Sequence, residues 1–387
     1  MTPAHYSTTP AQVRGIGMVE IMIGLAVALM ASLVIFQTLA VSEGYRRTTV
    51  SSAHANDNGN FALFSLERQL AGAGAGLVRA AGLWGCPLAL RRGSAPVLPA
   101  PSAFPTPFDS LPQTVRVAPL LVLDGGGSAP DTLLVLASKS AFAGTGVKVD
   151  AAPNANEVAV TSAAGINPGD LLMAFDAARP GSDCTVVQTA NSLVPPVAPA
   201  TVAMIANPLR YGGAVYSPVT GLTGYSTSTV LMNLGAAPTL VAFAVGTDAA
   251  SGRPFSLLRH DLIVGGVPVA IADNIVNMQV LYGVAATSST DTVSEWVSAT
   301  GAWALAALTD GSATASDRIG RLRGVRIALI ARSATEERDA ASPAAWALFL
   351  DRPAETVTGT LDADAQRFRY RSFDTIVPLR NMLLAND

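Results

Sequence analysis

The sequence from residue 21 to residue 42 reads IMIGLAVALMASLVIFQTLAVS and contains no charged side chain and no proline. As an α-helix, a segment of this length rises about 33 Å, which matches the roughly 30 Å hydrocarbon core of a bilayer. The segment is apolar on every side, so its helix belongs in lipid or among other apolar helices. The N-terminal region therefore predicts a membrane-embedded helix.

An acidic residue, Glu20, stands directly before this apolar segment. An ionised carboxylate near a membrane core is costly unless an opposite charge neutralises it. A cut between Gly15 and Ile16 would create an α-amine four residues before Glu20, and such an amine can neutralise the carboxylate of a neighbouring subunit. A secretory signal peptide, with Thr38-Leu39-Ala40 as a late cleavage site, has a shorter apolar core than this segment. A plain membrane anchor leaves the acid without a role.

The residues around this cut resemble the processing site of type IV prepilins. That family carries a Gly before the cleaved bond, an apolar residue after it, a Glu at the fifth mature position and then an unbroken apolar helix. Gly15, Ile16, Glu20 and the segment from Ile21 to Val41 occupy these positions in this sequence. The departure is Gly17-Met18, where the family usually has a small polar residue and an aliphatic one.

Later segments resemble the minor pilin subunits of the PilW kind. The end of the first helix, a Gly-Cys pair, two strands and a closing Leu-Arg-Asn follow each other in the family's order. In this sequence they are Phe61–Gly72, Gly85-Cys86, Ile275–Gly283, Val325–Ser333 and Val377–Asn381. The stretch from about residue 90 to residue 260 carries no such resemblance.

The resemblance implies three parts: a leader peptide over residues 1–15, an assembly helix over residues 16–76 and a β-rich globular domain over residues 77–387. It implies that prepilin peptidase cuts after Gly15, that Ile16 is N-methylated and that Glu20 acts in assembly. The protein would sit in the inner membrane by a single span and then join the pilus, with its globular domain periplasmic or extracellular. The implied partners are other minor pilins, the major pilin, the inner-membrane assembly machinery and a tip adhesin, and the implied outcomes are twitching motility, adhesion or DNA uptake.

The fold class we expect is α+β, with the long N-terminal helix packed on a large, mostly antiparallel β-rich domain. Leu63, Leu66 and Leu70 recur at helical spacing, which predicts that the helix continues beyond the membrane and packs one face on that domain. The Gly-rich run Ala71–Gly76 should end the helix, and Asn56–Gly59 is a candidate bend.

Short apolar or alternating runs between Gly, Pro and Asp predict the strands. They are residues 114–123, 132–137, 157–161, 171–175, 184–189, 201–205, 229–234, 239–245, 255–259, 274–282, 324–331 and 367–373. The Pro-rich stretch 91–113 is predicted to be a loop, and residues 302–308 a short helix.

The sequence has two cysteines, Cys86 and Cys184, and they allow one intramolecular pair. In the exported domain that the resemblance implies, oxidation to a disulfide is expected. The alternative is two buried thiols without a bond.

Composition and motifs argue against catalysis and against broad nucleic-acid binding. The 25 Lys+Arg and 28 Asp+Glu residues give a formal net charge of −3, so no basic excess exists to neutralise phosphates. The sequence lacks G-x-S-x-G, H-E-x-x-H, C-x-x-C and P-loop motifs, so we expect no enzyme activity, metal site or cofactor. Arg259-His260-Asp261 is interpreted as a strand-end turn, and the basic run Arg321–Arg326 as a solvated strand face or a partner surface.

Two rival functions remain open at this stage. A minor pseudopilin of a type II secretion system has the same kind of leader and helix, so the N-terminus does not separate it from a pilus subunit. An exported enzyme or lectin tethered by one helix is the rival of another class, and it predicts no cleavage after Gly15.

Overall fold

The computed structural model describes residues 17–77, 83–140, 146–154, 157–179, 181–190, 200–203, 210–211, 214–216 and 221–384. Its contacts divide the chain into two compact units, Met1–Ala53 and His54–Asp387. The leader residues, including Gly15 and Ile16, lie outside the described residues. The fold is α+β, as the sequence predicts: one long apolar N-terminal helix and a large β-sheet unit.

Helix α1 runs from Met18 to Leu70. It ends where the Gly-rich run begins, and residues 71–76 form turns in which Gly74 and Gly76 have φ of +74° and +73°, so the predicted helix stop is confirmed. The predicted bend at Asn56–Gly59 is wrong, because these residues are helical. A Cβ on Gly59 would lie 2.1 Å from a ring carbon of Phe373, so the phenyl ring packs directly on the helix backbone at this point.

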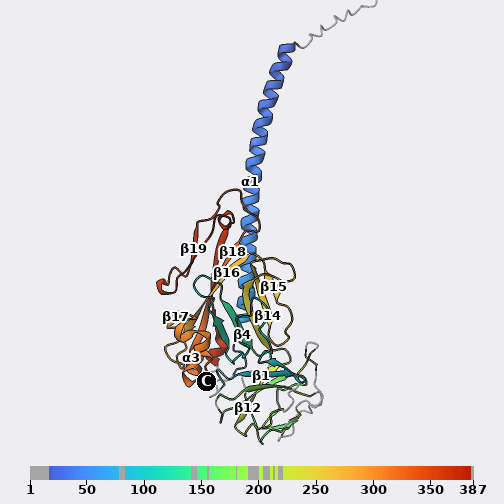
Figure 1. Ribbon diagram of the computed structural model, residues 1–387, viewed down its shortest axis with the longest axis vertical. Coiled ribbons are helices and arrows are strands. Elements are labelled where there is room, and N and C mark those ends of the chain that lie inside the picture. Colours follow the sequence, from blue (N-terminus) through green and yellow to red (C-terminus); the bar gives the residue numbers. More distant parts are fainter. Residues whose placement is uncertain are drawn as a thin grey trace, which may run out of the picture. The chain divides into compact units, whose positions relative to one another are not determined.

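The strands of the His54–Asp387 unit form three larger sheets and three two-stranded ones among the described residues (Figure 1). The six-stranded sheet contains, in spatial order, β2 (Ala95–Leu98), β1 (Leu88–Arg92), β8 (Cys184–Gln188), β7 (Leu171–Asp176), β12 (Thr229–Gly235) and β5 (Val147–Lys148). The five-stranded sheet contains β15 (Val269–Ala272), β14 (Ser256–Asp261), β13 (Thr239–Gly246), β4 (Thr132–Ala137) and β3 (Leu120–Leu123). The four-stranded sheet contains β17 (Glu295–Ser298), β16 (Ile275–Val284), β18 (Leu322–Arg332) and β21 (Tyr370–Pro378).

The two-stranded sheets pair β6 (Glu157–Val160) with β9 (Ala200–Ala203), β10 (Arg210–Tyr211) with β11 (Ala214–Val215), and β19 (Ala345–Leu348) with β20 (Val357–Thr360). Helical turns complete the unit: η1 (Gly301–Trp303), α2 (Leu305–Leu308), α3 (Ala313–Gly320), η2 (Pro353–Glu355), η3 (Ala365–Arg367) and α4 (Arg380–Leu384). Among the described pairs, β1 with β8 is parallel and the others are antiparallel.

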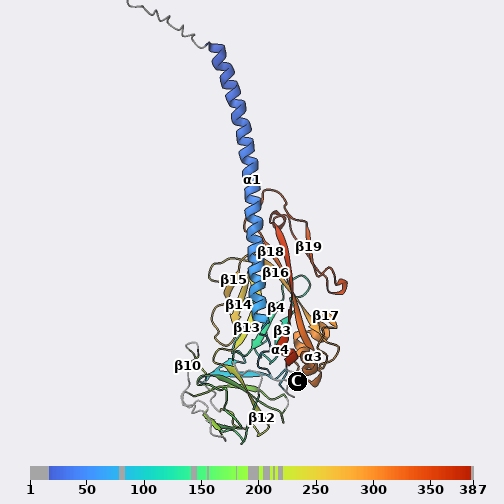
Figure 2. The same cartoon turned by 180° about the vertical axis from the view of Figure 1, so that it is seen from behind.

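The main core joins residues of α1 beyond Ala53 with residues of all three larger sheets. Leu66 and Leu70 are fully buried there, in one cluster with Met278 and Val280 of β16. Figures 1 and 2 show β16 and β18 beside this part of the helix from opposite sides. Burying one face of the helix in this way is what its leucine spacing predicts.

Most predicted strands are found within one or two residues of their expected ends, but three expectations fail. The predicted loop 91–113 contains the end of β1 and all of β2. Pro96 is tolerated because β2 is the edge of its sheet, and Pro96 pairs with Arg91 next to a bulge. Of the predicted strand 114–123, only its last four residues form a strand, β3. The strand predicted at 367–373 begins and ends later, as β21, and a 3₁₀ turn over Ala365–Arg367 precedes it.

Candidate assembly site

The apolar part of α1 is exposed within the Met1–Ala53 unit. Its large side chains, from Met18 to Leu39, have exposed fractions of 54–83%. By length and composition α1 is able to cross a membrane. It therefore fits a single-pass anchor, because an apolar helix with this much exposed surface needs lipid or other apolar helices around it.

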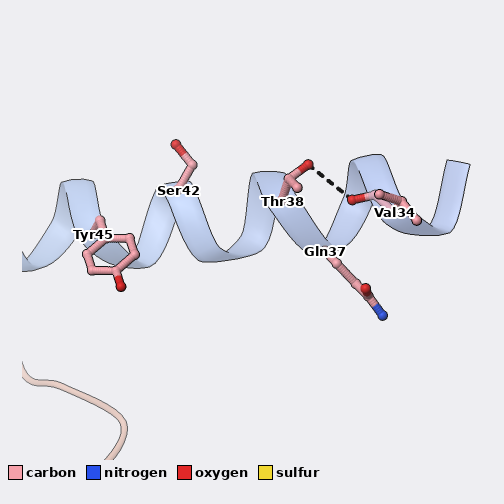
Figure 3. Close-up of a pocket in the computed structure, with 5 residues that line it drawn as sticks. All are labelled: Val34, Gln37, Thr38, Ser42 and Tyr45. Atoms are coloured by element: carbon pink, nitrogen blue, oxygen red, sulfur yellow. Dashed lines mark hydrogen bonds between the residues drawn. The ribbon is translucent and has the colours of Figure 1, made fainter. Parts of the chain in front are cut away.

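Two hydroxyl groups on this surface, those of Thr38 and Ser32, bond to the helix itself. The Thr38 hydroxyl donates to the carbonyl oxygen of Val34 at 3.1 Å (Figure 3) and to that of Ile35 at 2.8 Å. The Ser32 hydroxyl donates to the carbonyl oxygen of Ala28 at 2.8 Å. These bonds let polar residues enter an apolar environment without an unpaired donor. The depression that Figure 3 shows is lined by five residues of this one helix, so it encloses no ligand site.

Glu20 lies in the first turn of α1 and is exposed. Its backbone N–H donates to the Gly17 carbonyl oxygen at 2.9 Å. Among the described residues its carboxylate has no ion-pair partner. Ile16, whose amine is the proposed partner on a neighbouring subunit, lies outside the described residues, so cleavage, methylation and pairing stay predictions.

The second half of α1 is held by the C-terminal elements of the chain. The Thr375 hydroxyl of β21 donates to the carboxylate of Glu67. The side-chain amide of Asn381 in α4 donates to the carbonyl oxygen of Ala73 at 3.1 Å and to that of Ala71 at 3.4 Å. The end of the helix is therefore held by hydrogen bonds from β21 and α4 in addition to the packing of its buried leucines. These contacts fix which face of the helix packs against the sheets.

The basic run Arg321–Arg326 is neither a solvated face nor a free partner surface. Arg323 is 3% exposed, and its guanidinium donates to four backbone carbonyls, those of Ser288, Thr290, Gly320 and Leu322. Arg321 donates to the Ala285 carbonyl oxygen at 2.8 Å. Arginine side chains are usually exposed, so the sequence predicts exposed charges here. The backbone carbonyl oxygens that accept from Arg321 and Arg323 come together only in the folded structure.

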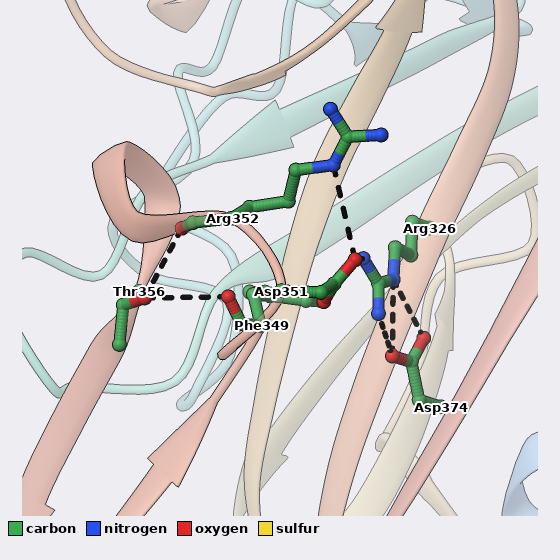
Figure 4. A network of polar contacts seen from close by, with 6 residues as sticks. All are labelled: Arg326, Phe349, Asp351, Arg352, Thr356 and Asp374. Carbon is green, nitrogen blue, oxygen red and sulfur yellow. Dashed lines mark hydrogen bonds and ion pairs between the residues drawn. The ribbon is translucent and has the colours of Figure 1, made fainter.

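Arg326 joins three segments on the outer side of the four-stranded sheet (Figure 4). Its Nη1 donates to Asp351 at 2.8 Å, and its Nε donates to both carboxylate oxygens of Asp374 at 3.0 Å. Asp351 follows β19 and Asp374 lies in β21, so the network fastens the β19–β20 hairpin to the sheet. The hydrogen bond from Arg326 lowers the pKa of the Asp351 carboxyl, which keeps the pair charged. This cluster is a structural clamp.

Among the described residues no group of three or more His, Cys, Asp and Glu side chains is placed to hold a metal ion. Within Arg259-His260-Asp261, the Asp261 carboxylate accepts from the backbone N–H groups of Ile263 and Val264 at 3.1 and 3.0 Å, as expected of a strand-end turn. His260 belongs to β14 and is buried, which the sequence does not predict.

The two cysteines form a disulfide that closes the start of the six-stranded sheet. Cys86 and Cys184 are bonded, with their Cα atoms 5.8 Å apart and 98 positions between them. Cys86 precedes β1 and Cys184 opens β8, the parallel pair of the sheet. The backbone N–H of Cys184 also donates to the Pro87 carbonyl oxygen at 2.7 Å. The bond therefore links two segments that are distant in the sequence.

Removing this disulfide is expected to lower the free energy of unfolding by about 3 kcal/mol, because the unfolded chain regains a long open loop. The measurement is urea unfolding of the full-length protein in detergent, comparing wild type with Cys86→Ser/Cys184→Ser. A reductant should destabilise the wild type and leave the double variant unchanged. Equal stability of wild type and variant without reductant would show that the bond contributes nothing.

A protein-family model matches part of this chain. The model of the type IV pilus-assembly protein W family (PilW) matches residues 242–381. The chain is PilW-like. The matched region runs from within β13 to α4 and includes the strands and Asn381 that hold the second half of α1. No curated protein and no solved structure is found to match the chain.

The family match bears on the resemblance drawn from the sequence. Three of the PilW-like segments, Ile275–Gly283, Val325–Ser333 and Val377–Asn381, lie inside the matched region and form β16, most of β18 and the end of β21 with α4. The resemblance to PilW is thereby confirmed, and with it an involvement in type IV pilus assembly. The disulfide and the apolar helix lie outside the matched residues.

Proposed function

We propose that this protein is a minor pilin of a type IV pilus. Prepilin peptidase removes residues 1–15, the new N-terminal Ile16 is methylated, and the mature subunit enters the fibre through α1. In the fibre the Glu20 carboxylate pairs with the terminal amine of a neighbouring subunit. The role is one of assembly, not of catalysis.

The observation that carries this proposal is the combination, on one helix, of exposed apolar side chains and an acid that has no ion-pair partner among the described residues. Large apolar side chains surround the helix with exposed fractions above one half, and Glu20 stands at its start. Lipid provides a favourable environment for the apolar side chains, but an ionised carboxylate next to lipid remains costly. A bundle of pilin helices, each with a free amine near its start, would cover the apolar side chains and neutralise the carboxylate.

The family match supports a pilus over a secretion pseudopilus, because the matching model describes pilus assembly. The partners we propose are other minor pilins, the major pilin, prepilin peptidase, the inner-membrane assembly machinery and a tip adhesin. Before assembly the protein spans the inner membrane once. The disulfide fits a globular part that is folded in the periplasm or outside the cell, where cystine persists.

The test of processing is mass spectrometry of the protein in sheared pili and in membranes. The fibre-bound chain is expected to begin at Ile16 with a methyl group on its nitrogen. Gly15→Val should abolish that product and leave the full-length chain in the membrane. Gly17→Ala is the matched control, because a Cβ at Gly17 meets no atom within 4 Å, and it should be processed normally.

Three results would contradict the proposal. A chain in pili that still begins at Met1 would exclude the cleavage, and a mature start at Val41 would identify the apolar segment as a secretory signal. Processing of Gly15→Val at the wild-type position and rate would mean that Gly15 does not define the site.

A further inference from the structure

A pocket lies in the His54–Asp387 unit, away from α1. Its walls come from the β1–β2 hairpin, the loop over residues 100–105 and the turn after β14, and its volume is about 250 Å³. Arg92, Pro96, Phe104, His260 and Gly265 are among the residues that line it. The size suits a ligand of about ten non-hydrogen atoms.

One wall of the pocket carries a buried histidine, His260, which is 3% exposed. Its Nδ1 is buried and has no hydrogen-bond partner among the described residues. The ring is stacked on Phe108, with centroids 5.5 Å apart, and meets Phe104 edge-on at 6.0 Å. Burial lowers the pKa of His260, so the imidazole is neutral at pH 7. A buried polar atom is normally paired, and the ring that carries this one lines a space that a ligand can fill.

The second unsatisfied group is the guanidinium of Arg92. Its Nη2 donates to the carbonyl oxygens of Ile263 and Val264, both at 3.0 Å, and lies 3.3 Å from the Tyr216 hydroxyl. All three acceptors are neutral. Among the described residues the buried Nε of Arg92 has no hydrogen-bond partner, and no carboxylate forms an ion pair with this side chain. The pocket therefore has a fixed positive charge that the described chain does not neutralise.

The acid next to this wall is already engaged. The carboxylate of Asp261 accepts from two backbone N–H groups of the turn and pairs with Arg259 at 3.3 Å. The Asp261 carboxylate is therefore paired with Arg259 and with the backbone of the turn, and it forms no ion pair with Arg92.

We propose that this pocket binds a small organic carboxylate with an apolar body. The carboxylate pairs with the guanidinium of Arg92, which lines the pocket and has no carboxylate partner among the described residues, and a ring N–H of His260, another lining residue, is a second donor. The apolar body packs on Pro96 and Phe104. A bare inorganic anion would leave these apolar walls unused, and a neutral ligand would leave the arginine unpaired. This proposal does not depend on the pilus function.

The test uses full-length protein with ¹⁵N-labelled histidine in detergent micelles, with benzoate as the probe. The sequence has three histidines, His5, His54 and His260, so His5→Gln and His54→Gln variants assign the His260 ring signals by elimination. Benzoate is expected to shift the His260 signals in a saturable way, with a dissociation constant on the order of 1 mM for a nine-atom ligand. The His5 and His54 signals should stay in place.

Matched variants and probes separate this site from unspecific binding. Ala103→Trp fills the mouth from an exposed lining position and should weaken benzoate binding at least tenfold. Ala249→Trp, at an exposed position outside the pocket, should leave binding unchanged. Benzyl alcohol, which has the ring but no charge, should bind at least tenfold more weakly than benzoate. An unshifted His260 at 20 mM benzoate, equal binding of the alcohol, or equal binding to Ala103→Trp would each overturn the proposal.

Discussion

Replacing Glu20 with Gln is expected to lower the amount of this protein in isolated pili at least tenfold, while its amount in the membrane stays the same. Gln keeps the size of the side chain and removes its charge. The amine of the neighbouring subunit then enters the apolar bundle unpaired, and leaving one member of a buried ion pair without its partner typically costs about 3–5 kcal/mol. Quantitative immunoblots of sheared pili and of membranes, normalised to the major pilin, measure the effect.

The matched control is Glu43→Gln on the same helix. Glu43 is exposed, lies beyond the apolar segment and is 4.0 Å from Arg46, an arrangement in which an ion pair contributes little. Its variant should enter pili at the wild-type level. Both variants should keep the disulfide and the thermal unfolding of the sheet-bearing unit, because Glu20 and Glu43 lie outside His54–Asp387. Wild-type incorporation of Glu20→Gln would exclude the pairing mechanism.

The sequence predicts correctly those elements whose local residue pattern matches their burial in the folded structure. The apolar run of α1 and strands such as β4 and β13 are apolar throughout and end at turn residues, so composition alone places them. The helix stop follows from repeated glycine. Local residue types are sufficient for these elements.

The errors arise where distant residues override a local signal. Asn56–Gly59 has turn-forming residues, yet it stays helical because Phe373 packs against the helix backbone there. Pro96 indicates a loop, yet an edge strand has no need of its missing N–H. Arg323 predicts exposed charge, yet it is buried under four carbonyls. In each case the contacting group is distant in the sequence or belongs to the backbone, so the local residue pattern does not predict the contact.

The functional residues also differ in how far the sequence predicts them. Glu20 is predictable, because the energetic cost of an ionised carboxylate beside an apolar run can be read directly from the sequence. The pocket beside His260 is not, since Arg92 and His260 are 168 positions apart in the sequence and come together only when β1 and β14 are in place. The anchoring of α1 by Thr375 and Asn381 also depends on tertiary contacts.

A buried carboxylate at the junction of two sheets gives the second large effect. Asp131 is 3% exposed and directly precedes β4. Its two carboxylate oxygens accept from the backbone N–H of Gly125, at 3.0 Å, and that of Val280 in β16, at 2.8 Å. Its own N–H donates to the Met278 carbonyl oxygen at 2.8 Å. The residue thus connects the five-stranded sheet with the four-stranded one.

Burial raises the pKa of Asp131 from 3.8 to about 7, and the nearby carboxylate of Asp124 raises it as well. The two backbone N–H donors act in the opposite direction but do not outweigh burial. The other titratable group facing it is Tyr282 of β16, whose pKa burial raises, so that it stays neutral. Asp131 is therefore mostly protonated in the folded protein below about pH 7.

The direction of the pH effect follows from the proton count. Between about pH 4 and pH 7 the folded protein keeps a proton on Asp131 that the unfolded chain has released. The free energy of unfolding therefore falls as the pH rises through this window and levels off above about pH 7. The two pKa values differ enough for a total of about 4 kcal/mol, at about 1.4 kcal/mol per pKa unit.

Asp131→Asn is expected to remove this dependence, because an amide does not titrate. The measurement is urea unfolding of full-length wild type and variant in detergent at intervals from pH 5 to pH 8, read as the difference between the two proteins. Effects of His260, whose lowered pKa makes stability rise with pH near 6, are common to both and cancel in this difference. Carboxylates such as Asp248, whose pKa hydrogen bonding from Ser251 lowers, act only below about pH 4.

The wild type should lose on the order of 2–3 kcal/mol relative to Asp131→Asn between pH 5 and pH 8, the part of the window that this range covers. The variant starts from a lower stability at pH 5, because its amide nitrogen faces a backbone N–H that the carboxyl group accepted. The control is Asp109→Asn, an exposed position, which should keep the wild-type slope. A wild-type slope in Asp131→Asn would mean that the buried carboxyl is not the group that binds the proton.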